Sequence, residues 1–438
     1  MDLDLIISNC RTLPQNNTSP ADNSLCYVAL KQDRIFSNGP MAELDSRWQA
    51  KRVIDAGGAL VMPGLINAHN HCAMTLFRGL ADDLPLTDWL QNHIFPAEAR
   101  FVSPEMVYWC SRLAAAEMIM SGTTTVADGY FFESDAARAF SDAGLRSVAA
   151  QGVIDFPSPD APNPLENITV AADYIRSWQG HDLITPAIFC HSPYTCSATT
   201  IIKAKELARD TGCRLFIHVS ETEAEVIQSR KQHSASPVRF LADLDILDQD
   251  TVCVHCVWLN NNDIQLIAES GASIVTCPES NMKLGSGIAP VAKFIAAGIR
   301  VGLGTDGAAS NNNLDLFAEI DSAAKLHKAV SHEPTVLPAA RVIDMATRDG
   351  ANLLGLNDTG ILTAGMKGDL IIVDLDKPHL TPQYDLASLM VYAASGSDVV
   401  TSIINGRIVM EDRVFPDTDL HQIMNIVQEM ATKVTTAI

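Results

Sequence analysis

From residue 59 to residue 304, short apolar runs alternate with longer stretches of helical pattern, and this alternation constrains the fold more than any other feature. Ser103-Pro104-Glu105 opens one helix, with serine as N-cap, and Ser121-Gly122 ends it. We expect buried strands at 59–62, 124–127, 146–150, 187–190, 215–218, 252–255, 273–276 and 301–304. Eight strands with intervening helices predict an α/β protein whose main domain, residues 59–362, is a (β/α)8 barrel.

The segments that flank this domain, residues 1–58 and 363–438, have the pattern of β-hairpins. The runs 27–30 and 34–36 flank a polar turn, and Asn405-Gly406 separates the runs 402–404 and 407–409. Further strands are expected at 5–7 and 369–373, and a helix at 339–354. We therefore expect the two chain ends to share one small sheet domain.

Polar side chains stand at the expected carboxyl ends of the barrel strands, where such barrels carry their chemistry. Because side chains alternate along a strand, His69 and His71 should point the same way and Asn70 the other way. The strand-end residues, in chain order, are His69 and His71, Asp128, Gln151, His191, His218, His255, Cys277 and Asp306. A single histidine of this kind would most simply be a solvated or buried structural residue. Four strands that end in histidine and two that end in aspartate predict one shared site.

Three imidazoles and one carboxylate, from His69, His71, His218 and Asp306, can hold one divalent ion per chain. The expected ion is zinc, and the set leaves a position for water. Water bound to such an ion ionises near neutral pH and can act as a nucleophile. The sequence therefore predicts a metal-dependent hydrolase.

Two further residues are candidates for proton transfer. Glu221 lies just past a strand end and can act as a general acid and base. Its alternative role is that of a helix N-terminal acid, which the helix dipole favours. His255 can hydrogen-bond the attacking water or the developing alkoxide.

Composition limits the partners. The net charge of −21 and the pI of about 4.8 argue against binding to nucleic acid. Ten cysteines without a disulfide framework fit a reduced compartment. The start, Met1-Asp2-Leu3-Asp4, lacks the features of a signal peptide, and no apolar run is long enough to cross a membrane. We expect a cytoplasmic protein that acts on a small molecule, and leave open whether it forms a homo-oligomer.

The motifs together resemble the amidohydrolase superfamily. They are Pro63-Gly64-Leu65-Ile66-Asn67-Ala68-His69-Asn70-His71, His218-Val219-Ser220-Glu221, His255 and Gly304-Thr305-Asp306-Gly307. The resemblance implies that the two chain ends form that superfamily's composite β-sandwich. Binuclear members carry a lysine at the fourth strand end, where this chain has His191, so the resemblance implies one metal.

Within that superfamily, the chain is similar to 5-methylthioadenosine/S-adenosylhomocysteine deaminases. The similar segments are 88–90, 96–98, 191–194, 277–284 and 305–312. The resemblance implies that Glu98 binds the ribose hydroxyls and that His191 contacts the nucleoside. It makes Glu221 the partner of a purine ring nitrogen, and Asp306 both a ligand and a proton acceptor. Trp89 either stacks on the substrate or belongs to the core.

The expected function is therefore the hydrolytic deamination of adenine nucleosides. The candidates are 5′-methylthioadenosine, S-adenosylhomocysteine and adenosine. An alternative is a related hydrolase for another ring, such as a guanine or pterin deaminase or an s-triazine chlorohydrolase. A non-enzymatic scaffold is a remote alternative, because all the expected ligands are present.

One departure from the family bears on the substrate. Relatives that accept S-adenosylhomocysteine carry arginines for its carboxylate. Here the matching strand end reads Gln151-Gly152, and the loop 156–164 has no arginine. An arginine–carboxylate pair is a strong, bidentate interaction. Its absence predicts a preference for 5′-methylthioadenosine.

Overall fold

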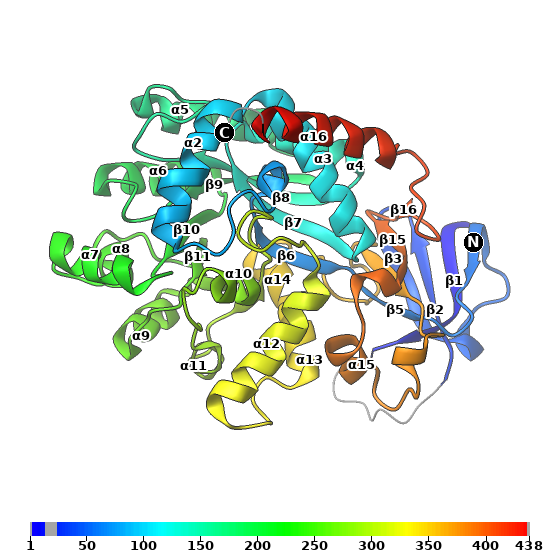
Figure 1. Cartoon of the computed structure of the whole chain (residues 1–438). Coiled ribbons are helices and arrows are strands. Elements are labelled where there is room, and N and C mark those ends of the chain that lie inside the picture. The colour runs from blue at the N-terminus through cyan, green and yellow to red at the C-terminus, as the bar shows by residue number, and fades with distance from the viewer. Residues whose placement is uncertain (1, 14–23, 436–438) are drawn as a thin grey trace.

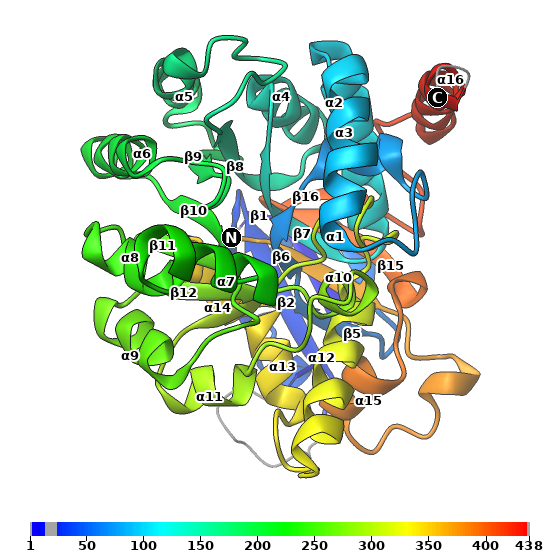
Figure 2. The ribbon, with the colours of Figure 1, turned by 60° about the vertical axis from the view of Figure 1, so that its left-hand side comes forward.

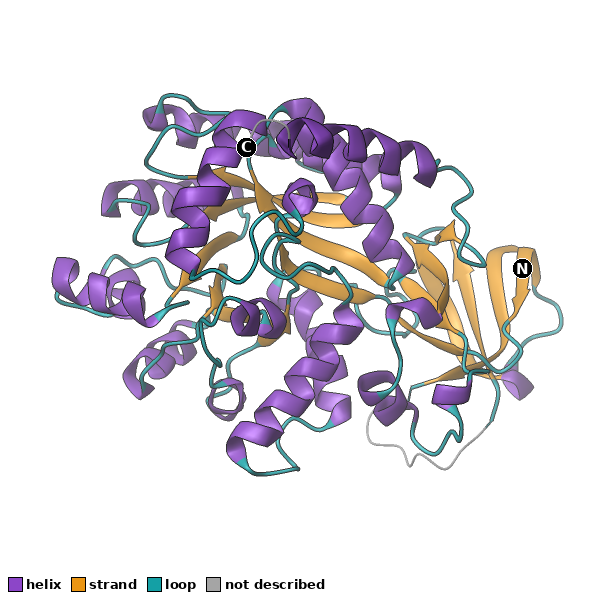
Figure 3. Cartoon of the chain, in the orientation of Figure 1, coloured by secondary structure: helices purple, strands orange, loops and turns teal. Residues whose placement is uncertain are grey.

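The computed structural model describes residues 2–13 and 24–435, and its strands form two separate sheets. One sheet is ringed by helices, and the other lies beside it near the N-terminus (Figures 1 and 3). Among the described residues, no helix is long and apolar enough to cross a membrane.

The first sheet is a parallel (β/α)8 barrel, as predicted. Its strands follow one another in chain order: β6 (Leu65–Asn70), β7 (Thr123–Tyr130), β8 (Arg146–Val153), β9 (Ile184–Cys190), β10 (Leu215–Val219), β11 (Thr251–His255), β12 (Ser273–Thr276) and β13 (Val301–Leu303). At the seam between β13 and β6, the amide of Asp306 donates to the carbonyl of His69 at 3.1 Å. This seam brings the two ends of the barrel sheet together.

Helices surround the barrel strands on the outside (Figure 2). They are α3 (Pro104–Met120), α4 (Glu133–Ala143), α5 (Asn167–Trp178), α6 (Ala198–Thr211), α7 (Glu223–His233), α8 (Pro237–Asp243), α9 (Asn261–Ser270), α11 (Val291–Ala296) and α12 (Leu316–Ser331). The predicted N-cap of α3 is confirmed, since Ser103 Oγ accepts from the amide of Met106 at 3.3 Å. The predicted helix at 339–354 is two helices, α13 (Ala339–Met345) and α14 (Arg348–Leu353), because the backbone breaks at Thr347 (φ −134°, ψ −97°).

The predicted barrel strand at 59–62 is wrong. Strand β5 (Leu60–Pro63) pairs with β1 (Asp2–Thr12) and β14 (Leu370–Val373) in the second sheet, and the first barrel strand is β6. The chain passes from one sheet to the other at Gly64, where a Cβ atom would lie 2.0 Å from Thr124 Oγ1. Both strands are fully apolar in pattern up to Ile66, so the alternation of side chains gives no sign of the break.

The second sheet is built from both chain ends, as predicted. Its order is β16 (Arg407–Met410), β15 (Val399–Ile404), β14, β5, β1, β2 (Cys26–Lys31) and β3 (Arg34–Pro40), and β4 (Gln49–Asp55) also pairs with β1. Apolar side chains from both ends form one core, for example Leu5, Val28, Ile372 and Ile403. The last helix, α16 (Leu420–Thr435), packs along α3 on the barrel (Figure 1). The domain boundaries at 58/59 and 362/363 stay predictions.

A buried ion pair ties the two sheets together. The guanidinium of Arg146, at the start of β8, donates from Nε to Asp369 Oδ2 at 2.5 Å and from Nη2 to Oδ1 at 3.1 Å. Asp369 directly precedes β14, and both side chains are at least 95% buried. Nη2 also donates to Asn405 Oδ1 at 3.1 Å. The barrel and the second sheet therefore share a buried charged contact.

We expect Arg146→Ala to destabilise the protein by roughly 3–5 kcal/mol, because it leaves the carboxylate of Asp369 buried without its partner. Chemical denaturation of the two proteins measures the difference. The matched control is Arg239→Ala, which breaks an exposed pair with Asp243. That change should cost at most about 1 kcal/mol. Equal shifts of the unfolding midpoint for the two variants would contradict the role given to Arg146.

Candidate metal centre and active site

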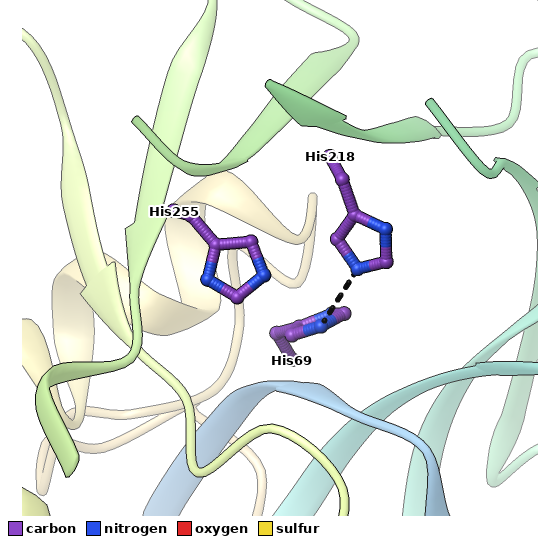
Figure 4. A group of neighbouring side chains, drawn as sticks. All are labelled: His69, His218 and His255. Carbon is purple, nitrogen blue, oxygen red and sulfur yellow. Dashed lines mark hydrogen bonds between the residues drawn. The ribbon is translucent and has the colours of Figure 1, made fainter. Parts of the chain in front are cut away.

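Three histidines and one aspartate converge at the carboxyl end of the barrel. His69 Nε2 and His71 Nε2 each lie 3.4 Å from Asp306 Oδ1, and His218 Nε2 lies 3.3 Å from His69 Nε2. These side chains come from the ends of β6, β10 and β13. Figure 4 shows the rings of His69, His218 and His255 facing one centre. The structure thus brings together all four residues that the sequence predicts as ligands.

The spacing of these atoms fits a divalent metal ion. Tetrahedral ligands that bind zinc at about 2.0–2.1 Å lie about 3.3–3.4 Å from one another. The separations between the donor atoms of His69, His71, His218 and Asp306 given above are 3.3 Å and 3.4 Å. His255 is close enough to join His69 and His218 as a second possible ligand group. The donor set therefore indicates a divalent metal, and the assignment of ligands within it stays a prediction.

Neighbouring groups fix the orientation of the site residues. His71 Nδ1 is paired with the carbonyl of Gly129 at 2.6 Å, which leaves Nε2 directed at the centre. His255 Nδ1 is paired with Asn281 Oδ1 at 3.0 Å, and Ser280 Oγ donates to Asp306 Oδ2 at 2.7 Å. Ser280 and Asn281 belong to the short helix α10 (Pro278–Lys283).

The protonation states of His69, His218 and Asp306 also favour the binding of a cation. Burial lowers the pKa of His69 to about 4 and that of His218 well below its usual value, so both rings are neutral near pH 7. Burial alone would raise the pKa of Asp306. The hydrogen bond from His69 and the electrostatic interaction with the surrounding imidazoles outweigh burial and hold this pKa well below its usual value. Neutral imidazoles beside an ionised carboxylate are the ligand forms that metals need.

Glu221 lies beside this cluster on a constrained turn. Its Oε2 is 3.8 Å from His255 Nε2, and its Oε1 accepts from Ser286 Oγ at 3.3 Å. The carboxylate of Glu225 anchors the turn by accepting the amides of Ser220 at 2.8 Å and Glu221 at 2.7 Å. Burial raises the pKa of Glu221. Burial therefore favours the protonated form of this carboxyl group, which a general acid requires.

A cavity of about 510 Å³ opens above the cluster. Its floor is polar and includes His71, His218, Glu221, His255 and Asp306. Its walls are mostly apolar and include Trp89, Ile94, Phe95, Ile154, Phe156 and Phe189. The size and the few convergent polar groups are typical of a site for a small organic ligand.

Three residues predicted from the family resemblance line this cavity. Glu98 lies in α2 (Phe95–Phe101), which continues the helical turns α1 (Leu86–Asp88) and η3 (Trp89–Ile94). His191 follows β9, and burial lowers its pKa to about 3. Trp89 is 95% buried and still contributes to the wall, so it belongs to both the core and the cavity.

Glu98 is paired inside the protein. The hydroxyl of Tyr130 donates to Glu98 Oε1 at 2.5 Å, and both residues are more than nine-tenths buried. Burial raises the pKa of Glu98 to about 7, although the hydrogen bond from Tyr130 opposes the rise. This carboxyl group therefore changes its charge within the physiological range.

Besides the predicted ligand His69, three of the strand-end residues do not line the cavity. Asp128 Oδ1 accepts the amide of Cys72 at 2.7 Å, and Cys277 precedes α10 as a buried residue. Gln151 is 98% buried, and its Nε2 donates to Asp160 Oδ2 at 2.7 Å. The side chains of Asp128, Gln151 and Cys277 therefore lie outside the cavity lining.

Sequence reasoning missed Tyr130, Ser280 and Asn281. Tyr130 lies two residues after Asp128, so the alternation of β7 could have placed it on the same face. Ser280 and Asn281 lie in a segment that resembles the family, but no pattern in the sequence pairs them with Asp306 and His255. Their contacts join residues 26 positions apart.

Comparison with known proteins places these features in one family. The model of the Amidohydrolase family matches residues 60–409. A 5-methylthioadenosine/S-adenosylhomocysteine deaminase of Syntrophobacter fumaroxidans is 48% identical over 92% of this chain and 92% of that protein. A 5′-deoxyadenosine deaminase of Methanosarcina mazei is 45% identical over 93% of both.

Solved structures agree with this relation. An adenosine deaminase from Xanthomonas campestris with bound zinc superposes with a TM-score of 0.96 over 99% of both chains, at 35% identity. An atrazine chlorohydrolase from Arthrobacter aurescens has a TM-score of 0.89 over 98% of this chain and 100% of its own, and at 21% identity it shows the fold alone. By its sequence, its barrel and its cluster of ligands, the chain belongs to the amidohydrolase family.

Proposed function

We propose that this protein is a zinc-dependent deaminase that hydrolyses the exocyclic amine of adenine nucleosides. The observation that carries the proposal is one cavity that joins three groups: the cluster of ligands, the buried carboxyl of Glu221 and the buried carboxyl of Glu98. Two relatives at 45–48% identity have names that describe deaminases of adenine nucleosides. The solved adenosine deaminase that resembles this chain has bound zinc.

His69, His71, His218 and Asp306 would hold the ion. When bound, zinc supplies the Lewis acidity that ionises water near neutral pH. Glu221 would donate its proton to the ring nitrogen beside the reacting carbon, and burial favours the protonated form that this step needs. Because His255 Nδ1 donates to Asn281 Oδ1, Nε2 keeps its lone pair in the neutral ring and would accept a hydrogen bond from the attacking water.

The remaining steps move protons and release ammonia. Asp306 would accept a proton from the attacking water, and Ser280 Oγ holds its other oxygen in place. That proton would pass to the exocyclic amine, which leaves as ammonia, while the hydroxyl on the reacting carbon returns its proton to Glu221 and becomes the carbonyl of the product. His191 would contact the nucleoside from the cavity wall, and Glu98 would accept a hydrogen bond from the ribose.

The side chains that line the cavity suit a nucleoside whose 5′ group is neutral. Among the described residues, the cavity lining contains no lysine and no arginine, whereas Glu98, Glu221 and Asp306 contribute carboxyl groups. Phe95 and Phe156 form an edge-to-face ring pair at 5.9 Å in this region. A methylthio or methyl group would pack on such side chains, and a carboxylate would find no cation to pair with.

A panel of substrates tests the function. Purified protein should release ammonia from adenosine, 5′-deoxyadenosine and 5′-methylthioadenosine, with a parallel loss of adenine absorbance. It should contain about one zinc ion per chain, and His69→Ala should lower the metal content because it removes one of four ligands. Removal of the ion by a chelator should abolish ammonia release. Ammonia from guanine alone, chloride from an s-triazine alone, or no metal in the active protein would overturn the proposal.

Glu221→Gln should lower kcat by at least about 10²-fold, since the amide keeps the shape but cannot transfer a proton. Metal content and thermal stability should stay close to those of the wild type. The matched control is Glu223→Gln, which changes an exposed acid two residues further on. A normal rate in Glu221→Gln would show that this carboxyl group only supports the turn.

The charge of Glu98 should give the enzyme a pH-dependent preference for ribose. Its pKa is about 7, so the carboxylate accepts hydrogen bonds above pH 7 and loses this ability as the pH falls. Loss of a hydrogen bond to a charged group lowers kcat/KM by about 10- to 150-fold. At high pH, adenosine should exceed at least one of 2′-deoxyadenosine and 3′-deoxyadenosine by that factor.

The kcat/KM of adenosine divided by that of the less active deoxyadenosine should decrease as the pH falls through 7. Because catalytic groups titrate equally for both substrates, the ratio isolates the groups that bind the ribose. A ratio that stays constant with pH, or that grows towards acid, would contradict this role of Glu98.

The protein should prefer 5′-methylthioadenosine to S-adenosylhomocysteine in kcat/KM. Gln151→Arg is a poor test of this preference, because Asp160 would take up the new guanidinium inside the protein. Phe156→Arg should narrow the gap, since Phe156 lines the cavity and is 37% exposed. The control is Leu165→Arg, which adds the same charge at a side chain that is 90% exposed and not part of the lining. A clear preference of the wild type for S-adenosylhomocysteine would refute the prediction.

A further inference from the structure

The contact between Tyr130 and Glu98 joins two separate parts of the cavity wall. Tyr130 ends β7, whereas Glu98 lies on α2, which covers the cavity from the side. Their hydrogen bond measures 2.5 Å, and both residues line the cavity. The pair is therefore part of the surface that a bound ligand meets.

Tyr130 and Glu98 each keep an oxygen atom that can accept a further hydrogen bond, but the two oxygens differ in charge. A tyrosine hydroxyl has one proton, and that of Tyr130 is donated to Glu98 Oε1. The phenol oxygen can still accept a hydrogen bond. Among the described residues, Glu98 Oε2 has no hydrogen-bond partner. The pair thus offers two free acceptors of different kinds, one neutral and one charged.

The barrel holds Tyr130 in place. Its amide donates to Glu133 Oε2 at 3.2 Å, and its ring lies 6.4 Å from that of His71 and 5.2 Å from that of Phe131. β7 pairs with barrel strands on both sides. The phenol oxygen is therefore fixed relative to the metal ligands, and the hydrogen bond fixes Glu98 to the same frame.

We propose that Tyr130 is a ribose-binding residue that sets specificity together with Glu98. Glu98 Oε2 accepts one of the two ribose hydroxyls, and the phenol oxygen of Tyr130 accepts the other. This inference rests on the proposed deamination of nucleosides. A vicinal diol brings two donors, and the pair supplies one acceptor for each of them.

The two hydroxyls should then contribute unequally. The hydroxyl at the ionised Glu98 is the one whose removal costs about 10- to 150-fold in kcat/KM, whereas the hydroxyl at the neutral phenol should cost about 2- to 13-fold. Steady-state kinetics with adenosine, 2′-deoxyadenosine and 3′-deoxyadenosine gives both ratios. The measurement is made at about pH 9, where a carboxyl group with a pKa of about 7 is ionised.

Tyr130→Phe removes the phenol oxygen and keeps the ring. Each ratio is the kcat/KM of adenosine divided by that of one deoxyadenosine. In this variant, the smaller ratio should fall to about 1, because the ribose hydroxyl that it reports on has lost its acceptor, the phenol oxygen. The larger ratio should remain above about 10. The freed Glu98 Oε1 lies 2.5 Å from the position of the missing phenol oxygen. Without moving, it therefore cannot accept the hydrogen bond that the phenol oxygen accepted. The loss should appear mainly in KM, since neither group touches the reacting carbon.

Tyr174→Phe is the matched control. Tyr174 is also buried, and its hydroxyl donates to the carbonyl of Ala149 at 2.8 Å, but it is not part of the cavity lining. Its removal deletes a buried tyrosine hydroxyl elsewhere in the barrel. Both ratios should stay at their wild-type values in this variant.

A second measurement does not depend on Tyr130→Phe alone. If the two residues act as one unit, the loss from Tyr130→Phe should be smaller in a Glu98→Gln background than in the wild type. Losses that multiply without coupling would overturn the inference, as would two ratios that Tyr130→Phe leaves unchanged. These results can occur only if the wild type deaminates nucleosides. Failure to release ammonia from any of the three would instead overturn the proposed function itself.

Discussion

The site depends on the close approach of β13 to β6, which joins the first and last strands of the barrel. Glycine at position 304 permits this approach, since a Cβ atom there would lie 2.8 Å from the amide nitrogen and the carbonyl oxygen of His69. Across the same seam, Asn67 Nδ2 donates to Thr305 Oγ1 at 2.7 Å, and the amide of Thr305 donates back to Asn67 Oδ1 at 3.0 Å. The carboxylate of Asp306 reaches the histidines of β6 only because this seam is closed. The geometry of the predicted metal ligands therefore depends on the closure of the barrel between β13 and β6.

Much of the fold could be predicted because its signals are local. Each barrel strand is a short apolar run next to a helical pattern. Asn405-Gly406 indicates a hairpin because asparagine and glycine readily adopt the backbone angles of a two-residue turn. The join at Gly64 was overlooked, because the strands on both sides of it are buried and apolar, although Pro63-Gly64 is a signal for a break in the strand. The break at Thr347 was also hidden, since helical periodicity continues on both sides of it.

The site could be predicted in part for a related reason. Ligands at the ends of parallel strands must meet, so the positions of His69, His71, His218 and Asp306 along the chain determined their convergence. Side chains that act from loops and short helices carry no such rule. Tyr130 and Glu98 are 32 positions apart, and only the packing of α2 against β7 brings them together. Gln151 lies within β8, two residues before its end, and the sequence does not reveal that Asp160 holds its side chain inside the protein.

The junction at Gly64 couples the two sheets in a further way. The amide of Gly64 donates to the carbonyl of Asp369 in the second sheet, and the amide of the next residue, Leu65, donates to the carbonyl of Gly122 in the barrel. No residue separates these two bonds, so we expect β5 and β6 to open together. An ion bound at His69 and His71 should then slow the opening of strands that it never touches. Amide hydrogen exchange in the chain-end sheet becomes a remote report on the occupancy of the metal centre.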